Sequence, residues 1–114
     1  MSYKFSVSAT EHFSRQIKYL AKKYPSVKSD LAKLISLLTG QPLMGDPVGK
    51  NCYKIRFKIT SKNTGKSGGA RVITFVKAST YKVVLIDIFD KSEKENISDS
   101  YLKRLLDKIK DQIV

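Results

Sequence analysis

The chain has 114 residues, of which 41% are hydrophobic, and its formal net charge is +12 at pH 7. This length suits a single domain over residues 1–114, and the apolar share excludes an intrinsically disordered chain. Cys52 is the only cysteine, which excludes an internal disulfide and fits a reducing compartment. No charged-then-apolar leader opens the sequence, and no apolar run approaches the ~20 residues of a membrane helix. We therefore expect a cytoplasmic protein.

The first third of the sequence predicts a strand followed by a helical hairpin. Apolar and polar residues alternate over residues 3–8, as in a half-buried strand. Thr10 can cap a helix with an amphipathic pattern, and Pro25 ends that helix. A second amphipathic helix follows, with Gly40 as its C-terminal cap. A tight turn joins the two helices, which together form a hairpin over roughly residues 11–39.

The rest of the sequence predicts an antiparallel sheet and a last helix. A loop rich in Gly and Pro covers residues 41–51, and the strictly alternating run YKIRFKI at 53–59 favours a strand. Residues 71–76 and 82–89 form two more strands, joined by links short enough for an antiparallel meander. Ser98 caps the last helix. The fold class is α+β, with the helical hairpin covering one face of the sheet and the opposite face left open.

The positive charge is concentrated in the middle of the chain. No acidic residue lies between Asp46 and Asp87, whereas lysines and arginines recur throughout this interval. A basic block of this kind indicates a polyanionic partner: RNA, DNA, an anionic membrane or an acidic protein.

Two common kinds of site are excluded by the pattern of residues. The Gly-Lys-Ser at residues 65–67 is the tail of a P-loop, but Thr60 stands where that motif requires glycine, and a strand follows instead of a helix. The segment is therefore interpreted as a turn. His12 and Cys52 are the only residues of their kinds and lie in different predicted elements, which excludes a zinc-type ligand cluster. We expect Cys52 to be a packing residue.

The remaining candidate is a cationic face on the sheet. Lys54, Arg56 and Lys58 point the same way along one predicted strand, roughly 7 Å apart. Like charges on a sheet face repel, and a bound anion would relieve that repulsion. Arg71 opens the next strand and Lys91 follows the last one, so both can converge on this face. Such a cluster can cleave a phosphodiester without a metal, because arginine stabilises the phosphorane charge and a lysine crowded by cations can accept a proton.

Three runs of sequence resemble the RelE/ParE-type toxin superfamily: residues 53–57, 69–74 and 85–93. They are most similar to its HigB-like branch, in which a Gly-Lys-x-Gly-Gly-x-Arg loop lies between two strands and the last strand ends in an aromatic-x-Lys segment. The helical hairpin also fits, so the resemblance covers nearly the whole chain. It implies a RelE-like fold and a toxin of a type II toxin–antitoxin pair, inhibited by a separate antitoxin.

The resemblance also implies an activity. Members of the RelE-like side are ribosome-dependent endoribonucleases that cut mRNA with the RNA's own 2′-hydroxyl as the nucleophile. The resemblance implies neither a cofactor nor a membrane partner. Two alternatives remain: a ParE-like inhibitor of DNA gyrase on the same fold, and a non-catalytic basic RNA-binding module. The antitoxin is expected to cover the basic face or to dock beside the final helix.

By the same resemblance, catalytic roles fall on four residues. Arg56 and Arg71 match the strand arginines that hold the scissile phosphate. Lys54 matches a basic strand residue that serves either in proton transfer or in phosphate contact, and Lys91 matches the basic position after the last strand.

RNA-contacting roles fall on residues around these four. Given the implied activity, Lys58, Lys62 and Lys66 would contact the backbone of ribosomal or messenger RNA, with salt-sensitive affinity. Phe89 stands where many relatives carry a tyrosine, and it can stack on a base but cannot donate a proton. The general acid is therefore left open, with Tyr81 and Tyr101 as possible substitutes.

Overall fold

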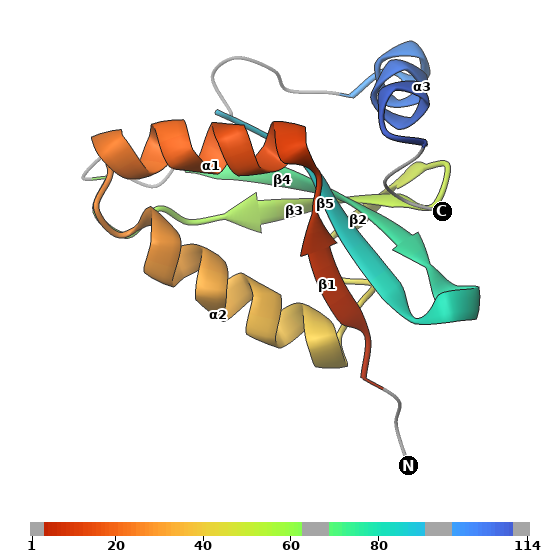
Figure 1. Ribbon diagram of the computed structural model, residues 1–114, viewed down its shortest axis with the longest axis horizontal. Coiled ribbons are helices and arrows are strands. Elements are labelled where there is room, and N and C mark those ends of the chain that lie inside the picture. The colour runs from red at the N-terminus through yellow and green to blue at the C-terminus, as the bar shows by residue number, and fades with distance from the viewer. Residues whose placement is uncertain (1–3, 63–68, 91–96, 111–114) are drawn as a thin grey trace.

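A computed structural model of the chain describes residues 4–62, 69–90 and 97–110 (Figure 1). In chain order the elements are β1 (Ser6–Ala9), α1 (Glu11–Lys23), α2 (Val27–Gly40), β2 (Asp46–Gly49), β3 (Cys52–Phe57), β4 (Ala70–Lys77), the short 3-10 helix η1 (Ala78–Thr80), β5 (Lys82–Asp90) and α3 (Asp99–Lys108). The predicted α+β class is confirmed. None of the helices in the described ranges is long and apolar enough to cross a membrane.

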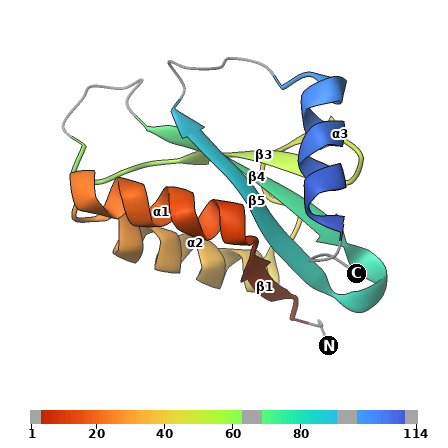
Figure 2. The ribbon, with the colours of Figure 1, turned by 45° about the horizontal axis from the view of Figure 1, so that its top comes forward.

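The helical hairpin forms where the sequence predicts it, and Figure 2 shows α1 and α2 packed together on one side of the sheet. The Thr10 hydroxyl caps α1 by accepting a hydrogen bond of 3.1 Å from the backbone N–H of Phe13. α2 runs one residue further than predicted, because Gly40 is its last residue and Gln41 its C-terminal cap.

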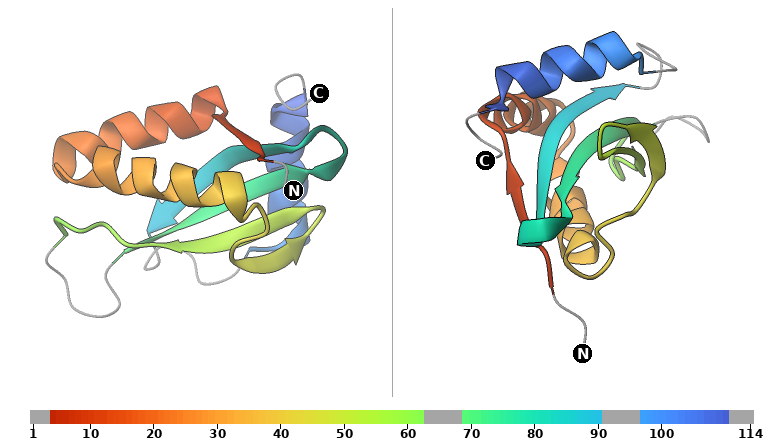
Figure 3. Two further views of the ribbon diagram at one scale, coloured as in Figure 1. Left: turned by 90° about the horizontal axis from the view of Figure 1, so that it is seen from below. Right: turned by 90° about the vertical axis from the view of Figure 1, so that its right-hand side faces the viewer.

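The sheet has the strand order β1-β5-β4-β3-β2 (Figure 3). β3, β4 and β5 form the predicted antiparallel meander. β1 joins the sheet at its β5 edge in parallel orientation, which is possible because the whole hairpin and meander intervene between the two strands.

The predicted loop over residues 41–51 contains a strand that the sequence did not reveal. β2 pairs antiparallel with β3, and a two-residue turn at Lys50 and Asn51 joins them, with φ of 54° and 61°. Left-handed residues at both positions suit a tight hairpin between twisted strands. Pro47 is tolerated because β2 lies at the edge of the sheet. A four-residue strand that contains Pro and Gly has no clear alternation to detect.

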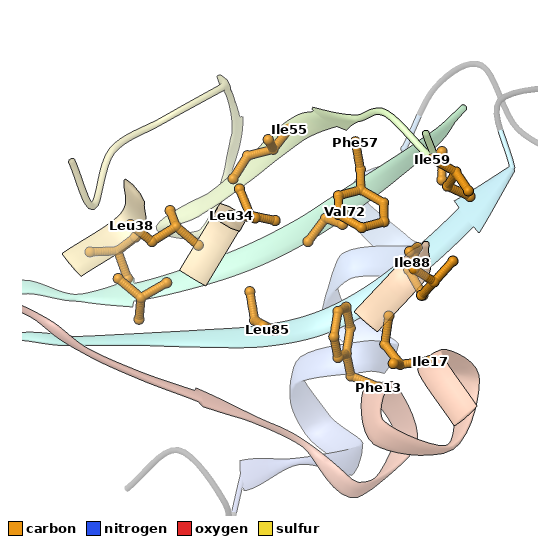
Figure 4. Packing of buried hydrophobic residues seen from close by; sticks show 14 residues of the cluster. Phe13, Ile17, Leu34, Leu38, Ile55, Phe57, Ile59, Val72, Leu85 and Ile88 are labelled. Carbon is orange, nitrogen blue, oxygen red and sulfur yellow. The ribbon is translucent and has the colours of Figure 1, made fainter. Parts of the chain in front are cut away.

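The main hydrophobic core lies between the hairpin and one face of the sheet (Figure 4). Its members include Phe13, Ile17, Leu34, Leu38, Ile55, Phe57, Ile59, Val72, Leu85 and Ile88. Burial of each such side chain contributes about 1.5–3 kcal/mol. Ile55 and Phe57 both belong to this core, which confirms the alternation predicted for their strand. Lys54 and Arg56 therefore face the other side of the sheet.

The opposite face was expected to be open, and this expectation is wrong for its β4 and β5 side. α3 packs there and buries Leu102 and Ile109 against the sheet (Figures 1 and 3). The sheet contributes Cys52, Ile73, Val84, Ile86 and Phe89 to this second core. Every residue of β5 from Val83 to Phe89 is buried, as expected for a strand covered on both faces.

Candidate functional site

Two arginines lie directly opposite each other on the α3 side of the sheet. Arg56 of β3 pairs in register with Arg71 of β4, and Arg71 pairs in register with Phe89 of β5. Opposed residues of an antiparallel pair hold their Cβ atoms about 4.5–5.5 Å apart on one face. Arg56 is exposed and Arg71 is half-buried, with its Nη1 donating to the carbonyl oxygen of Ala70 at 3.1 Å.

Neither guanidinium is neutralised within the part of the chain that the structure describes. No described carboxylate lies within ion-pair distance of Arg56 or Arg71. Like charges directly opposite each other destabilise a strand pair, so a bound anion between them would be stabilising. Planar guanidinium groups bind phosphate through two parallel N–H donors, and a pair of them suits one phosphate group.

Lys54 adds a third cation to the same face. It lies two residues before Arg56 on β3, half-buried, with Ile73 opposite it on β4 and Asp46 opposite it on β2. Gly45 (φ 93°) fixes the backbone here, because a Cβ atom at that position would collide with the carbonyl oxygen of Lys54. The structure thus brings together three of the four predicted catalytic residues.

The other predicted cations are placed differently. Lys58 is exposed just after the end of β3. Lys62 is only 14% exposed: its Nζ lies 2.6 Å from Asp90 Oδ2 and 5.6 Å from the centre of the Tyr24 ring. Lys62 therefore joins α1 to the end of β5, and its contact with RNA stays a prediction. Lys66 and Lys91 lie outside the described residues.

The two ends of the Gly-rich segment between β3 and β4 are held by identifiable contacts. At its far end, Gly69 has φ 138°, and a Cβ atom there would lie 3.1 Å from the carbonyl oxygen of Phe57. A side chain at this position would strain the backbone and crowd the start of β4. Glycine thus allows β4 to begin close to the end of β3, which sets the register of Arg71 against Arg56.

The near end of the segment is held by a buried carboxylate of α2. Asp30 accepts hydrogen bonds from the backbone N–H and the hydroxyl of Thr60, at 2.8 and 2.6 Å, and from the hydroxyl of Ser26 at 2.8 Å. Burial raises the pKa of Asp30, but these hydrogen bonds and the nearby Lys33 outweigh burial and lower the pKa below its usual value. The ionised carboxylate therefore fixes the point at which the chain leaves the sheet.

Phe89 is 6% exposed and belongs to the second core, beneath α3. It lies at the predicted place, in register with Arg71, but its ring packs against apolar neighbours. Stacking of Phe89 on a base stays a prediction, and it requires the ring to become accessible.

Asp87 is the polar residue whose importance the sequence reasoning missed. It is 1% exposed and accepts hydrogen bonds from the Tyr101 hydroxyl at 2.5 Å and from Gln16 Nε2 at 2.9 Å, while His12 Nε2 lies 3.4 Å away. A single acid within the apolar run of β5 was the available signal, because a buried charge needs several partners. Asp87 thus joins α1 and α3 to the sheet.

The two candidate tyrosines lie in different parts of the molecule. Tyr101 is engaged by Asp87, whereas Tyr81 follows η1 at the other end of β4 from Arg71, with its ring edge-on to Phe5. Tyr81 is therefore not near the arginine pair. Of the two acids in the second half of β5, Asp87 is buried and Asp90 is ion-paired with Lys62.

Cys52 packs in the second core as predicted. It is 1% exposed, and its thiol donates to the carbonyl oxygen of Lys50 at 3.5 Å. Burial raises the pKa of this thiol to about 11, against a smaller opposing effect of the Lys50 charge. Among the described residues, no group of three or more His, Cys, Asp and Glu side chains is arranged to hold a metal ion.

The fold and the site together define a small α+β domain in which a helical hairpin supports a sheet whose other face carries opposed arginines. The sequence has no significant match to any protein-family model or to any curated protein. Its structure is similar to that of a double arginine-to-alanine mutant of the E. coli toxin RelE in the free state. The TM-score is 0.61 at 14% identity, over 95% of this chain and 99% of that one. The chain has the RelE-like fold.

Proposed function

We propose that this protein is the toxin of a type II toxin–antitoxin pair and acts as a ribosome-dependent mRNA endoribonuclease. The observation that carries the proposal is the registered pair of Arg56 and Arg71, which has no described carboxylate partner and lies beside Lys54. The RelE-like fold supports the same class of function. Assignment to the HigB-like branch rests on the sequence resemblance.

The proposed reaction needs only the RNA and these side chains. The 2′-oxygen of one nucleotide attacks the adjacent phosphorus, the P–O5′ bond breaks, and a 2′,3′-cyclic phosphate and a 5′-hydroxyl end result. Arg56 and Arg71 bind the phosphate and stabilise the additional charge of the phosphorane. Lys54 serves either as the base that takes the 2′-hydroxyl proton or as a further phosphate contact, and a second group returns a proton to the 5′-oxygen.

Two partners follow from this proposal. The ribosome presents the mRNA, and a net charge of +12 favours association with its RNA. A separate antitoxin, acidic where it meets the cationic face, would inhibit the toxin by covering the arginine pair or by docking beside α3.

The test is a series of single substitutions: Lys54→Ala, Arg56→Ala and Arg71→Ala. Each variant is expressed from a tightly controlled promoter, growth is recorded, and the 5′ ends of mRNA on translating ribosomes are mapped. Loss of one transition-state contact of the oxyanion type lowers the rate about 10²–10³-fold, so each arginine variant is expected to relieve growth arrest and remove the cleavage ends.

Lys28→Ala is the matched control, because Lys28 is an exposed cation of α2 on the other side of the sheet. It should retain full toxicity. Growth arrest that survives all three site variants would refute the proposal. DNA breaks with intact mRNA would indicate a gyrase inhibitor instead, and RNA binding that falls by equal steps without any cleavage would indicate a non-catalytic module.

A further inference from the structure

Two cavities adjoin the outer surface of α1, each with a volume of about 510 Å³. The first cavity lies between α1 and α3, where Figure 2 shows the beginning of α1 near the end of α3. The second cavity lies between α1, the start of β4 and the end of β5. His12 and Arg15 line both cavities, so the two cavities adjoin; together they are named here the α1 trough.

Cations dominate the α1 trough. Those that line it are Arg15, Lys23, Arg104 and Lys108. Of its acids, Asp90 is already ion-paired with Lys62 at 2.6 Å, and Glu11 faces Arg15 at 3.6 Å in an exposed pair of little strength. The trough therefore has an excess of positive charge, which favours an extended polyanion.

Tyrosine rings alternate with these cations. Tyr19 is 67% exposed and lines the trough. The ring of Tyr24, also in the lining, has two ammonium groups near it: its centre is 5.9 Å from Lys23 Nζ and 5.6 Å from Lys62 Nζ. Cationic grooves with open aromatic rings are the arrangement that binds single-stranded nucleic acid, because phosphates contact the cations while bases stack on the rings.

The sheet end of the α1 trough adjoins the strands that carry the candidate cleavage site, with the side chain of Arg71 on the other face of β4 from Ala70. Ala70 and Phe89 line its sheet end; Ala70 precedes Arg71 in the chain, and Phe89 is the registered neighbour of Arg71 on β5. We propose that the trough binds a single-stranded segment of RNA, with the backbone along the cations and a base stacked on Tyr19. The choice of RNA as the ligand rests on the proposed function.

The test measures binding without cleavage. The full chain carrying Arg56→Ala and Arg71→Ala is titrated against a fluorescein-labelled single-stranded RNA, with fluorescence anisotropy recorded at several salt concentrations. Adding Arg15→Gln and Lys23→Gln is expected to lower the slope of log affinity against log salt by about 1.4, since a single strand contributes about 0.7 per phosphate contact. Adding Tyr19→Ala is expected to weaken binding by about tenfold, and Tyr19→Phe to leave it unchanged.

The matched control is Lys18→Gln with Lys22→Gln. Both lysines are exposed on α1, and their removal changes the net charge equally, but neither lines the trough. Because salt screens the attraction between these two lysines and an RNA bound in the trough, the control pair is expected to change the affinity for RNA by less than about twofold. Thermal melting of each variant confirms that the fold is retained.

Three results would overturn the inference: no binding by the parent chain, equal losses for the trough pair and the control pair, or displacement of the RNA by poly-glutamate of equal charge at lower concentration. The last result would assign the trough to an acidic protein. Because the parent chain lacks both site arginines, these outcomes are independent of cleavage. Failure of the native chain to cleave mRNA would refute the proposed function and leave the binding result standing.

Discussion

The side-chain amide of Gln16 forms two hydrogen bonds with the backbone of Ile88. Gln16 Nε2 donates to the Ile88 carbonyl oxygen at 3.0 Å, and Gln16 Oε1 accepts from the Ile88 N–H at 3.1 Å. This pattern imitates a neighbouring strand. The two hydrogen bonds lie where β5 has no strand beside it, because the pairing of β1 with β5 ends at Leu85. The rest of the β5 edge lies beside α1. A helix side chain thus satisfies an edge that β1 is too short to cover.

Gln16→Leu is expected to destabilise the fold. Leucine has a similar size but leaves the buried backbone groups of Ile88 without partners, at a cost of about 1–3 kcal/mol for each unsatisfied group. Urea unfolding measures the change, and amide hydrogen exchange at Ile88 should accelerate. Ser14→Ala, an exposed change in the same helix, is the control. Equal stability of the two variants would contradict the role assigned to Gln16.

Tyr101→Phe is expected to loosen α3. The hydroxyl of Tyr101 donates at 2.5 Å to the buried carboxylate of Asp87, and loss of a hydrogen bond to a charged group costs about 1.5–3 kcal/mol. Hydrogen exchange should show reduced protection in α3, with a smaller change in β4. The exposed Tyr19 provides the control, since Tyr19→Phe should leave both elements unchanged. If α3 keeps its full protection, the Asp87 contact does not anchor that helix.

The lowered pKa of Asp30 leads us to expect that the free energy of unfolding depends on pH in a specific way. Its folded pKa lies below the usual value, so its contribution is present above about pH 4, the ordinary pKa of an aspartate, and is lost as the pH falls through the folded pKa. Asp30→Asn should therefore lower the free energy of unfolding near pH 7 by about 1.5–3 kcal/mol, with the difference from wild type shrinking in acid. Chemical unfolding across this pH range measures it. Parallel curves for the two proteins would contradict the assignment, and Asp107→Asn, exposed on α3, is the control.

Much of the fold follows from the sequence because its signals are local. The alternation around Ile55 and Phe57, the cap at Thr10 and the stop at Pro25 each act within a few residues, and each is found in the structure. Of the three cations predicted to share a face, Lys54 and Arg56 do so because both lie on β3, where side chains alternate between the faces, whereas Lys58 follows the end of β3.

The features that were missed depend on distant parts of the chain. β2 is a strand only because β3 lies beside it, and α3 covers a face that sequence alternation cannot show to be covered. In the sequence Asp87 marks only the end of the acid-free interval, but its role is set by partners 71 and 14 residues away, Gln16 and Tyr101. Such long-range pairing has no local signature, although a lone acid in an apolar strand marks the position where partners must exist.

Cys52 is expected to resist thiol reagents in the folded protein. Its pKa is raised to about 11, so at pH 8 almost no reactive thiolate is present, and the sulfur is also inaccessible. Iodoacetamide should modify Cys52 only at the rate at which the protein unfolds, and fully in denaturant. Mass spectrometry of intact protein after timed exposure measures this. Rapid modification under native conditions would show that the second core opens far more readily than its packing implies.

The opposed arginines Arg56 and Arg71 are expected to lower the stability of the folded protein while they support its activity. Arg56→Gln removes a like-charge contact with Arg71, so at low salt the variant should be more stable than wild type by about 0.2–1 kcal/mol while losing activity. Added phosphate should raise the melting temperature of wild type more than that of the variant, because only the intact pair forms the anion site. Lys28→Gln removes the same charge from the other side of the sheet and should leave the response to phosphate unchanged. Identical phosphate responses in wild type and Arg56→Gln would show that the pair does not bind an anion, which would remove the main support for the proposed cleavage site.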